Sequence, residues 1–278
     1  MANSRALDVE ILPNEIAPID VLALTAAVKA LENPTFTARV MNRIGRTINL
    51  AGRALPSPVT KAISFATEKS ITVALHVALR SLKGEKAKAN PSNQMHKALA
   101  AGSGAVGGLF GIAALAVELP ASTILMLRSI ADVARAEGEN LSDPMAAMNC
   151  LEVFALGGRP AGLDQEESGY FAVRALMAKT VTEAARYVAS QGVINESAPV
   201  LVRLISQIAA RFGVVVSQKI AAQAVPIVGA VGGASVNYAF MAHFQTIAKA
   251  HFTVRRLERH YGADLIKTEY ERLAQKKR

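Results

Sequence analysis

Apolar side chains recur at helical spacing along almost the whole chain, and prolines and glycines punctuate that pattern. Asp143 followed by Pro144 has the pattern of a helix N-cap with proline in the first turn, and Gly157-Gly158 is typical of a helix end. Gly262 is expected to end the last long helix. The predicted helices span residues 17–32, 37–54, 59–82, 120–138, 144–157, 170–190, 199–212 and 220–261, with a short amphipathic helix in the tail.

Two long segments of the sequence stand out because they contain no charged residue. The first covers 20 residues from Ala98 to Val117, and the second covers 29 residues from Ile220 to Ala248 and is broken at Pro226. Glycines four residues apart place bare backbone on one helical stripe, where a second helix can approach closely. These packing candidates are Gly104, Gly107, Gly108, Gly111, Gly229 and Gly233.

The first run is long enough to cross a bilayer, since 20 helical residues span about 30 Å. Its few large apolar side chains contribute only about −2 to −4 kcal/mol to insertion, which is marginal. The second run contains polar side chains such as Asn237 and His243, which are poorly suited to a lipid-exposed span. Spanning, shallow membrane contact and packing inside a soluble core all remain open.

The amino-acid composition narrows the choice of fold class. Apolar residues make up 51% of the 278-residue chain and aromatic residues only 5%, so sandwiches and barrels are disfavoured. We predict an all-α fold, a single multi-helix domain with a central glycine-rich, close-packed helix pair. Its parts are an acidic leader at 1–36, basic amphipathic helices at 37–94 and a helical core at 95–278, the last two expected to form one unit.

Charge points to an anionic partner. The net charge is +9, and residues 39–88 alone hold ten basic side chains against two acids. One face of the 37–54 helix is cationic and lies beside an apolar line, which favours anionic lipid headgroups over a merely solvated face. Nucleic acid is disfavoured, because no aromatics or recognition motif accompany the charge. The headgroup candidates are Arg39, Arg43, Arg46 and Arg53.

Catalytic signatures are sparse. The string Gly102–Gly107 matches a dinucleotide-binding pattern literally but lacks the preceding strand, and the five histidines show no metal-binding spacing, so we expect no cofactor and no metal. Cys150, the single cysteine, is expected to be a buried, inert thiol.

The charges after the first uncharged run form a candidate polar patch for a headgroup or partner. Arg128 and Asp132 can pair at i, i+4 on one helix face. The patch comprises Glu118, Arg128, Asp132 and Arg135. Two alternatives to a membrane protein stay open: a hydrolase acting on lipid or peptide that uses Glu118, Asp132 and His243, and a soluble scaffold that binds a protein partner.

The N-terminal residues are too acidic for a secretory signal, so a cytoplasmic protein, peripheral to the inner membrane, is expected. A protein partner or a second copy of the chain is left open.

Several motifs together resemble the EcsC family of bacterial proteins over roughly residues 95–262. They are the glycine-rich run with Glu118-Leu119-Pro120, the segment Met126–Asp132, the segment Cys150–Gly158, the Pro226…Gly229…Gly233…Asn237 series, and Arg256-Leu257-Glu258…Tyr261-Gly262. The resemblance implies a mostly helical protein associated with membrane processes, since the family is named after an operon that also encodes transporter subunits. The family has no agreed enzymatic activity, so the resemblance implies no catalytic residue.

Overall fold

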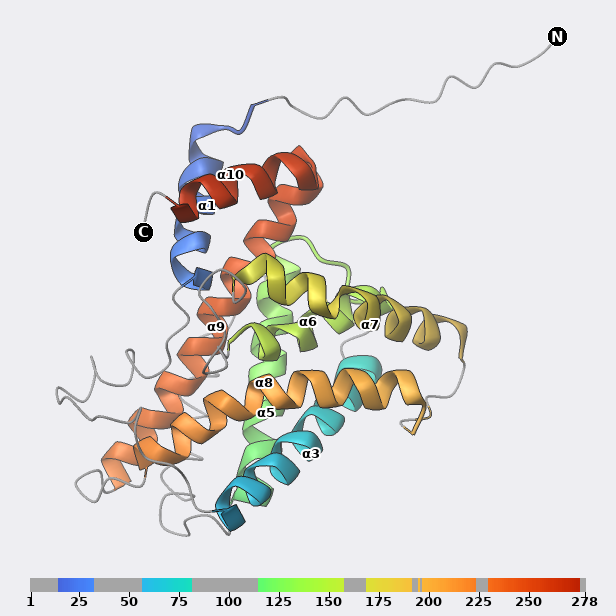
Figure 1. Ribbon diagram of the computed structural model, residues 1–278, viewed down its shortest axis with the longest axis vertical. Helices are drawn as coiled ribbons and strands as arrows, with labels where there is room; N and C mark the ends of the chain where they lie inside the picture. The colour runs from blue at the N-terminus through green and yellow to red at the C-terminus, as the bar shows by residue number, and fades with distance from the viewer. Residues whose placement is uncertain are drawn as a thin grey trace.

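The computed structural model describes residues 15–32, 57–81, 115–157, 169–191, 195, 197–223 and 230–275. This part of the chain forms helices and contains no strand, which confirms the all-α class (Figure 1). The helices are α1 (Pro18–Glu32), α3 (Ser57–Ser81), α5 (Leu115–Ala136), α6 (Pro144–Leu156), α7 (Tyr170–Ser190), α8 (Pro199–Gln223), α9 (Ala230–Tyr261) and α10 (Ala263–Gln275).

Helix α6 lies at the centre of the molecule, and the longer helices surround it (Figure 1). It contacts α3, α5, α7, α8 and α9. Every residue from Ala146 to Leu156 is buried, so this helix has no solvent face. Apart from Asn149 and Glu152 these buried residues are apolar, as expected of a helix at the centre of a core.

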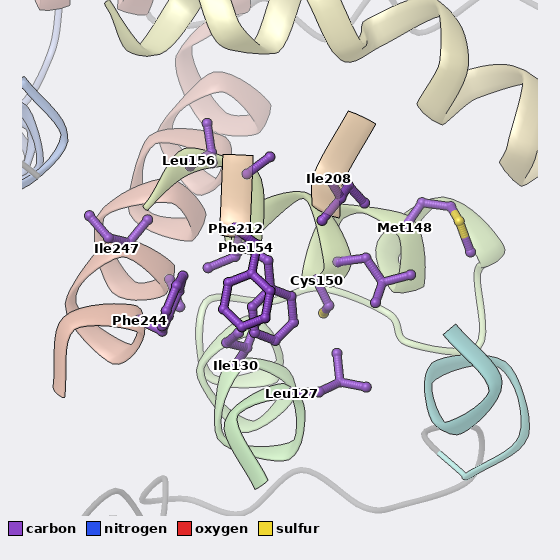
Figure 2. Close-up of a cluster of buried hydrophobic side chains, with 14 of the residues drawn as sticks. Leu127, Ile130, Met148, Cys150, Phe154, Leu156, Ile208, Phe212, Phe244 and Ile247 are labelled. Atoms are coloured by element: carbon purple, nitrogen blue, oxygen red, sulfur yellow. The ribbon is translucent and has the colours of Figure 1, made fainter. Parts of the chain in front are cut away.

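Aromatic rings tie this central helix to its neighbours (Figure 2). The ring centroids of Phe154 on α6 and Phe212 on α8 are 5.1 Å apart, and Phe244 on α9 lies 5.3 Å from Phe154. Phe240 extends the cluster along α9 at 5.3 Å from Phe244. Edge-to-face packing of this kind adds to the area that the rings bury.

Helices α1 and α10 cover the C-terminal half of α9 at one end of the molecule, and α3 and α8 lie side by side at the other (Figure 1). Buried side chains from all of the described helices belong to one continuous core. Helix α3, in the basic region of the sequence, packs against α5, α6 and α8. The segment boundaries predicted at residues 36 and 94 stay a prediction.

The predicted helix ends are largely confirmed. The Asp143 carboxylate accepts a hydrogen bond from the Met145 N–H at 2.8 Å, and Pro144 opens α6, whose C-cap is Gly157. Gly262 has φ +91° and separates α9 from α10. Gly138 has φ +84° in the turn after α5. Both positive φ values lie in the region that favours glycine.

Three boundaries differ from the prediction. The helix predicted over 220–261 begins at Ala230, as α9, and residues 220–223 belong to α8. Helix α5 begins at Leu115, so Pro120 lies inside it rather than at its start. A proline this close to the N-terminus gives up one backbone hydrogen bond at most. Helix α8 continues through Gly213 to Gln223, eleven residues beyond the predicted end at Phe212. Val215 and Val216 are buried beyond that glycine, and their burial favours continuation.

The predicted glycine-rich helix pair stays a prediction. Gly104, Gly107, Gly108, Gly111 and Gly229 lie outside the described residues. Gly233 lies in the first turns of α9.

Candidate functional site

The outer face of α3 combines two lysines with an exposed aromatic ring. Lys61, Phe65 and Lys69 follow one another at intervals of four residues, so they share one side of the helix, and all three are exposed. Phe65 exposes 64% of its surface. The opposite side of α3 is buried in the core through Ile63, Ala66, Ile71 and Leu75.

We call Lys61, Phe65 and Lys69 the α3 face. One acid, Glu68, is exposed nearby, and Arg80 is exposed in the last turn of the helix. An exposed ring between two lysines on an amphipathic helix suits a surface that is anionic outside and apolar beneath. The α3 face belongs to the predicted basic region, whereas Arg39, Arg43, Arg46 and Arg53 lie outside the described residues.

A buried ion pair joins the ends of the two uncharged runs. Glu118 directly follows the first run and Lys219 directly precedes the second. The Lys219 ammonium donates to Glu118 Oε1 at 2.8 Å, and the Asn237 amide donates to the same oxygen at 3.1 Å. The ammonium also lies 5.0 Å from the centroid of the Phe240 ring.

Lys219 is fully buried, and burial lowers its pKa while Glu118 opposes that shift. Removing an ammonium from water is costly, so the carboxylate and the ring together offset part of that cost. The sequence indicated Glu118 but missed Lys219. A lysine at the edge of an uncharged run was the available signal, but its partner lies 101 residues away.

The remaining residues of the predicted polar patch lie elsewhere on α5. Asp132 pairs with Arg135 at 3.1 Å, at spacing i, i+3, rather than with Arg128, which is exposed. Glu118 precedes Asp132 by fourteen residues, which is about 21 Å along a helix. The four predicted residues are therefore divided between two places, and only Asp132 and Arg135 make contact.

The three acid–base candidates also have separate partners. His243 is buried on α9, and its Nε2 lies 2.8 Å from the Gly157 carbonyl oxygen at the end of α6. Glu118 contacts Lys219 and Asn237, as described above. Asp132 contacts Arg135. The hydrogen bonds of Glu118 join α5 to α8 and α9, that of His243 joins α9 to the end of α6, and that of Asp132 lies within α5.

A second buried polar network was not anticipated from the sequence. The Tyr170 hydroxyl on α7 lies 3.0 Å from His251 Nδ1 on α9 and accepts a hydrogen bond from Arg174 at 3.2 Å. The two terminal nitrogens of Arg174 also donate to the two carboxylate oxygens of Glu258, at 2.7 and 3.1 Å. Burial holds the pKa of His251 well below its usual range, and the nearby arginines act in the same direction.

Glu152 on α6 is the buried acid next to this network. Burial raises its pKa from an ordinary 4.5 to about 7, against the opposing effect of Arg174. Of the three charged side chains that are buried in the described residues, Asp132 and Lys219 are in ion pairs, whereas Glu152 is in none. Cys150 is buried as expected, and burial raises the pKa of its thiol, so it stays protonated and unreactive.

One described helix has the length and apolar composition needed to cross a membrane, the segment Pro199–Ala221 of α8. It differs from both uncharged runs named from the sequence. Its most apolar window is 44% buried inside the fold, and a core helix of a soluble protein meets the same criterion. Most of the first run lies outside the described residues, and the second run from Ala230 onward forms part of α9.

These features describe an all-α protein with a fully buried central helix, an internal ion pair and a basic, aromatic outer face on α3. The model of the EcsC protein family matches residues 23–257, which is most of the chain. The chain therefore belongs to the EcsC family, as its motifs indicated. Comparisons with curated proteins and with solved structures gave no match.

Proposed function

We propose that this EcsC family member is a non-enzymatic accessory protein that associates with anionic lipid at the cytoplasmic side of the inner membrane. The basic amphipathic helices supply the contact, and α3 is the one described in structural detail. The observation that carries the proposal is the α3 face, where an exposed phenylalanine is flanked by two exposed lysines. Lysines near an anionic leaflet contribute about 1 kcal/mol each, and the ring adds apolar burial.

The chemistry of the interior supports an accessory role over the hydrolase alternative. Glu118 is engaged by Lys219 and Asn237, and His243 is engaged by a backbone carbonyl. A general acid or base must reach the proton that it transfers in a bound substrate. Groups already bound to separate partners inside the fold are poorly arranged for shared catalysis.

The test is co-sedimentation of the purified protein with vesicles of phosphatidylcholine alone or mixed with phosphatidylglycerol, at low and high salt. We expect binding to the anionic vesicles and release by salt. The variant Lys61→Glu/Lys69→Glu removes two attractions of about 1 kcal/mol each, so its affinity should fall at least about thirtyfold. Phe65→Ser should weaken binding that persists as salt is raised.

Matched controls lie on other helices. Lys179 on α7 and Lys267 on α10 are exposed lysines, so Lys179→Glu/Lys267→Glu makes the same change in net charge away from α3. Leu176 exposes 64% of its surface, the same fraction as Phe65, and provides the control Leu176→Ser. Equal losses in the α3 and control variants would show that net charge alone, rather than the α3 face, drives binding. Absence of binding to anionic vesicles would overturn the proposal.

The glycine-rich runs provide a second mode of contact within the same proposal. Binding that survives high salt points to shallow insertion of apolar segments, because screening weakens charge but not burial. Salt-sensitive binding alone assigns the contact to the basic helices.

A further inference from the structure

The first turns of α7 are attached to α9 through a single guanidinium group. Arg174 donates two hydrogen bonds to the Glu258 carboxylate, at 2.7 and 3.1 Å, and a third to the Tyr170 hydroxyl at 3.2 Å. The guanidinium also lies 5.3 and 5.5 Å from the ring centroids of Tyr170 and Phe171. Glu258 is the one acid that pairs with Arg174 in the described part of the chain, so this attachment depends on one ion pair.

Tyr170 connects this attachment to two further helices. Its backbone N–H donates to Glu32 at the end of α1, at 3.2 Å, and its ring stacks on the ring of Tyr270 from α10 with 5.4 Å between the centroids. The Tyr270 hydroxyl donates to the same Glu32 oxygen at 2.7 Å. The start of α7 is therefore the point at which contacts from α1, α9 and α10 meet, and a change in the contacts of Arg174 affects all of them.

Glu152 on α6 adds a second carboxyl group to the surroundings of Arg174. Burial raises the pKa of Glu152 to about 7, and among its neighbours Arg174 and Arg255 lower that pKa whereas Glu258 raises it. Both arginines are already engaged, Arg174 by Glu258 and Arg255 by Glu139. An ionised Glu152 therefore gains a charge partner only when one of these arginines moves toward it and away from its present acid.

One N–H donor in the same cluster has no acceptor. The Tyr170 hydroxyl accepts from Arg174, so its own proton is donated to His251 Nδ1, and the proton of the neutral imidazole is on Nε2. His251 Nε2 is buried without a hydrogen-bond partner among the described residues. Burial and the nearby arginines hold the pKa of His251 well below its usual range, so this N–H can donate to a carboxylate but supplies no charge.

The other helices around α6 direct their charged groups elsewhere. Arg135 of α5 acts on Cys150, which lies two residues before Glu152 and so on nearly the opposite side of α6. Lys219 of α8 pairs with Glu118, and the charged side chains described on α3 are exposed. The charges that surround Glu152 therefore come from α7 and α9.

We propose that Glu152, Tyr170, Arg174, His251 and Glu258 form a pH-sensitive latch for the N-terminal half of α7, closed while Glu152 is protonated and loosened when it ionises. In the closed state, Arg174 pairs with Glu258 alone, as the structure shows. Ionisation places two carboxylates around Arg174, which divides its hydrogen bonds between them and weakens the attachment of α7 to α9. Proton loss therefore frees the first turns of α7 while the rest of the core stays packed.

Amide hydrogen exchange of the full chain without lipid, at pH 6 and pH 8, tests the latch separately from the proposed function. A carboxyl group with a pKa of about 7 in the closed state and 4.5 once exposed makes the opening constant about tenfold larger at pH 8 than at pH 6. After correction for intrinsic exchange rates, the protection of residues 170–178 should fall by that factor. Residues 126–134 of α5 should keep their protection. Equal losses in both segments, or no loss in α7, overturn the proposal.

Variants of Glu152 assign the pH dependence to this carboxyl group. Glu152→Gln cannot ionise, so residues 170–178 should be equally protected at pH 6 and pH 8. Glu152→Leu removes the carboxyl group without adding an amide to the core and should give the same result. Glu183→Gln makes the matched change at an acid of α7 whose side chain is 39% exposed, and it should retain the tenfold loss. A pH dependence that persists in both Glu152 variants overturns the proposal.

Glu258→Gln tests whether the two carboxylates share Arg174. Without the charge of Glu258, Arg174 is available to Glu152, which then ionises more readily. In the unmodified chain the protection of residues 170–178 should level off above about pH 7. In the variant it should level off about one pH unit lower or more, because an opposite charge nearby lowers a carboxyl pKa by about that amount. An unchanged levelling pH overturns the proposal.

Discussion

Two regions of the molecule handle charge in opposite ways. Near the N-terminal end of α9, Lys219 of α8 is fully buried. Its ammonium has one acidic partner, Glu118, at 2.8 Å. At the other end, Arg255, Arg256 and Arg259 are partly exposed and pair with three acids, one of which, Glu139, binds both Arg255 and Arg259. Those acids are Asp20 on α1 together with Glu137 and Glu139, which flank the positive-φ Gly138.

The two regions differ in how they respond when one charged partner is removed. A buried pair that loses one member leaves an uncompensated charge in the core, and water cannot replace the missing partner. In the outer network, each arginine that loses one acid keeps another contact or turns toward solvent. The interior pair therefore fixes the relative positions of α5, α8 and α9, whereas the outer network adds small, replaceable increments that hold α1 and the α5–α6 turn on α9.

The largest effect is expected from breaking the buried pair. Glu118→Ala leaves Lys219 charged and buried, and we expect a loss of about 3–5 kcal/mol in the free energy of unfolding. The double variant Glu118→Leu/Lys219→Met removes both charges and should recover most of that loss. Urea denaturation followed by circular dichroism measures both. A single variant that loses less than about 1 kcal/mol would mean that water reaches the lysine.

Glu152 extends this comparison to the pH dependence of the free energy of unfolding. Its pKa in the folded protein, about 7, is above its ordinary 4.5, so the folded state binds this proton more tightly than the unfolded chain. Stability from this group is fully present below pH 4.5 and is lost as pH rises to 7, a change of about 3 kcal/mol.

The matching variant is Glu152→Gln, which cannot ionise. It should equal the unmodified protein in stability at low pH and exceed it by about 3 kcal/mol above pH 7. Thermal or urea unfolding across the pH range measures the difference. Parallel pH profiles for the two proteins would contradict burial of the charged carboxylate.

Glycines provide a similar contrast in packing. A Cβ on Gly157 would lie 2.6 Å from Phe244 Cε1 and 3.0 Å from His243 Nε2, so Gly157→Ala should cost about 1–3 kcal/mol. A Cβ on Gly169 would make an ordinary contact at 3.7 Å with Glu32, so Gly169→Ala should be nearly neutral. Melting temperatures compare the two variants. Equal shifts would show that the aromatic cluster yields easily.

The smallest effect is expected in the outer network. Arg256 contacts both Asp20 and Glu137, but its side chain is 38% exposed, so Arg256→Ala should cost about 1 kcal/mol. High salt should reduce the difference from the unmodified protein, because screening acts on exposed pairs. A loss as large as that of Glu118→Ala would erase the distinction between the two regions.

Much of the fold follows from local sequence signals, and the candidate site does not. Asp143 with Pro144, and Gly157, set the ends of α6 through interactions within a few residues, so the sequence alone predicts them. The extension of α8 past Gly213 depends on burial against other helices, which a local pattern does not contain. The spacing of Arg128 and Asp132 indicated a pair, but Asp132 contacts Arg135 instead. The link between Glu118 and Lys219 joins residues 101 apart, and only the folded chain brings them together.

The hydrogen bonds of Glu32 join segments of the chain that are synthesised at different times. It is the last residue of α1, and its carboxylate accepts hydrogen bonds from the Tyr170 backbone N–H at the start of α7 and from the Tyr270 hydroxyl. Helix α1, which precedes the other described helices in the chain, thus supplies a cap for a helix that starts 138 residues after Glu32, and it is anchored by a side chain 238 residues further on. The apolar side of α1 therefore stays uncovered until α9 and α10 have been made, and exposed apolar surface of this kind favours aggregation during folding.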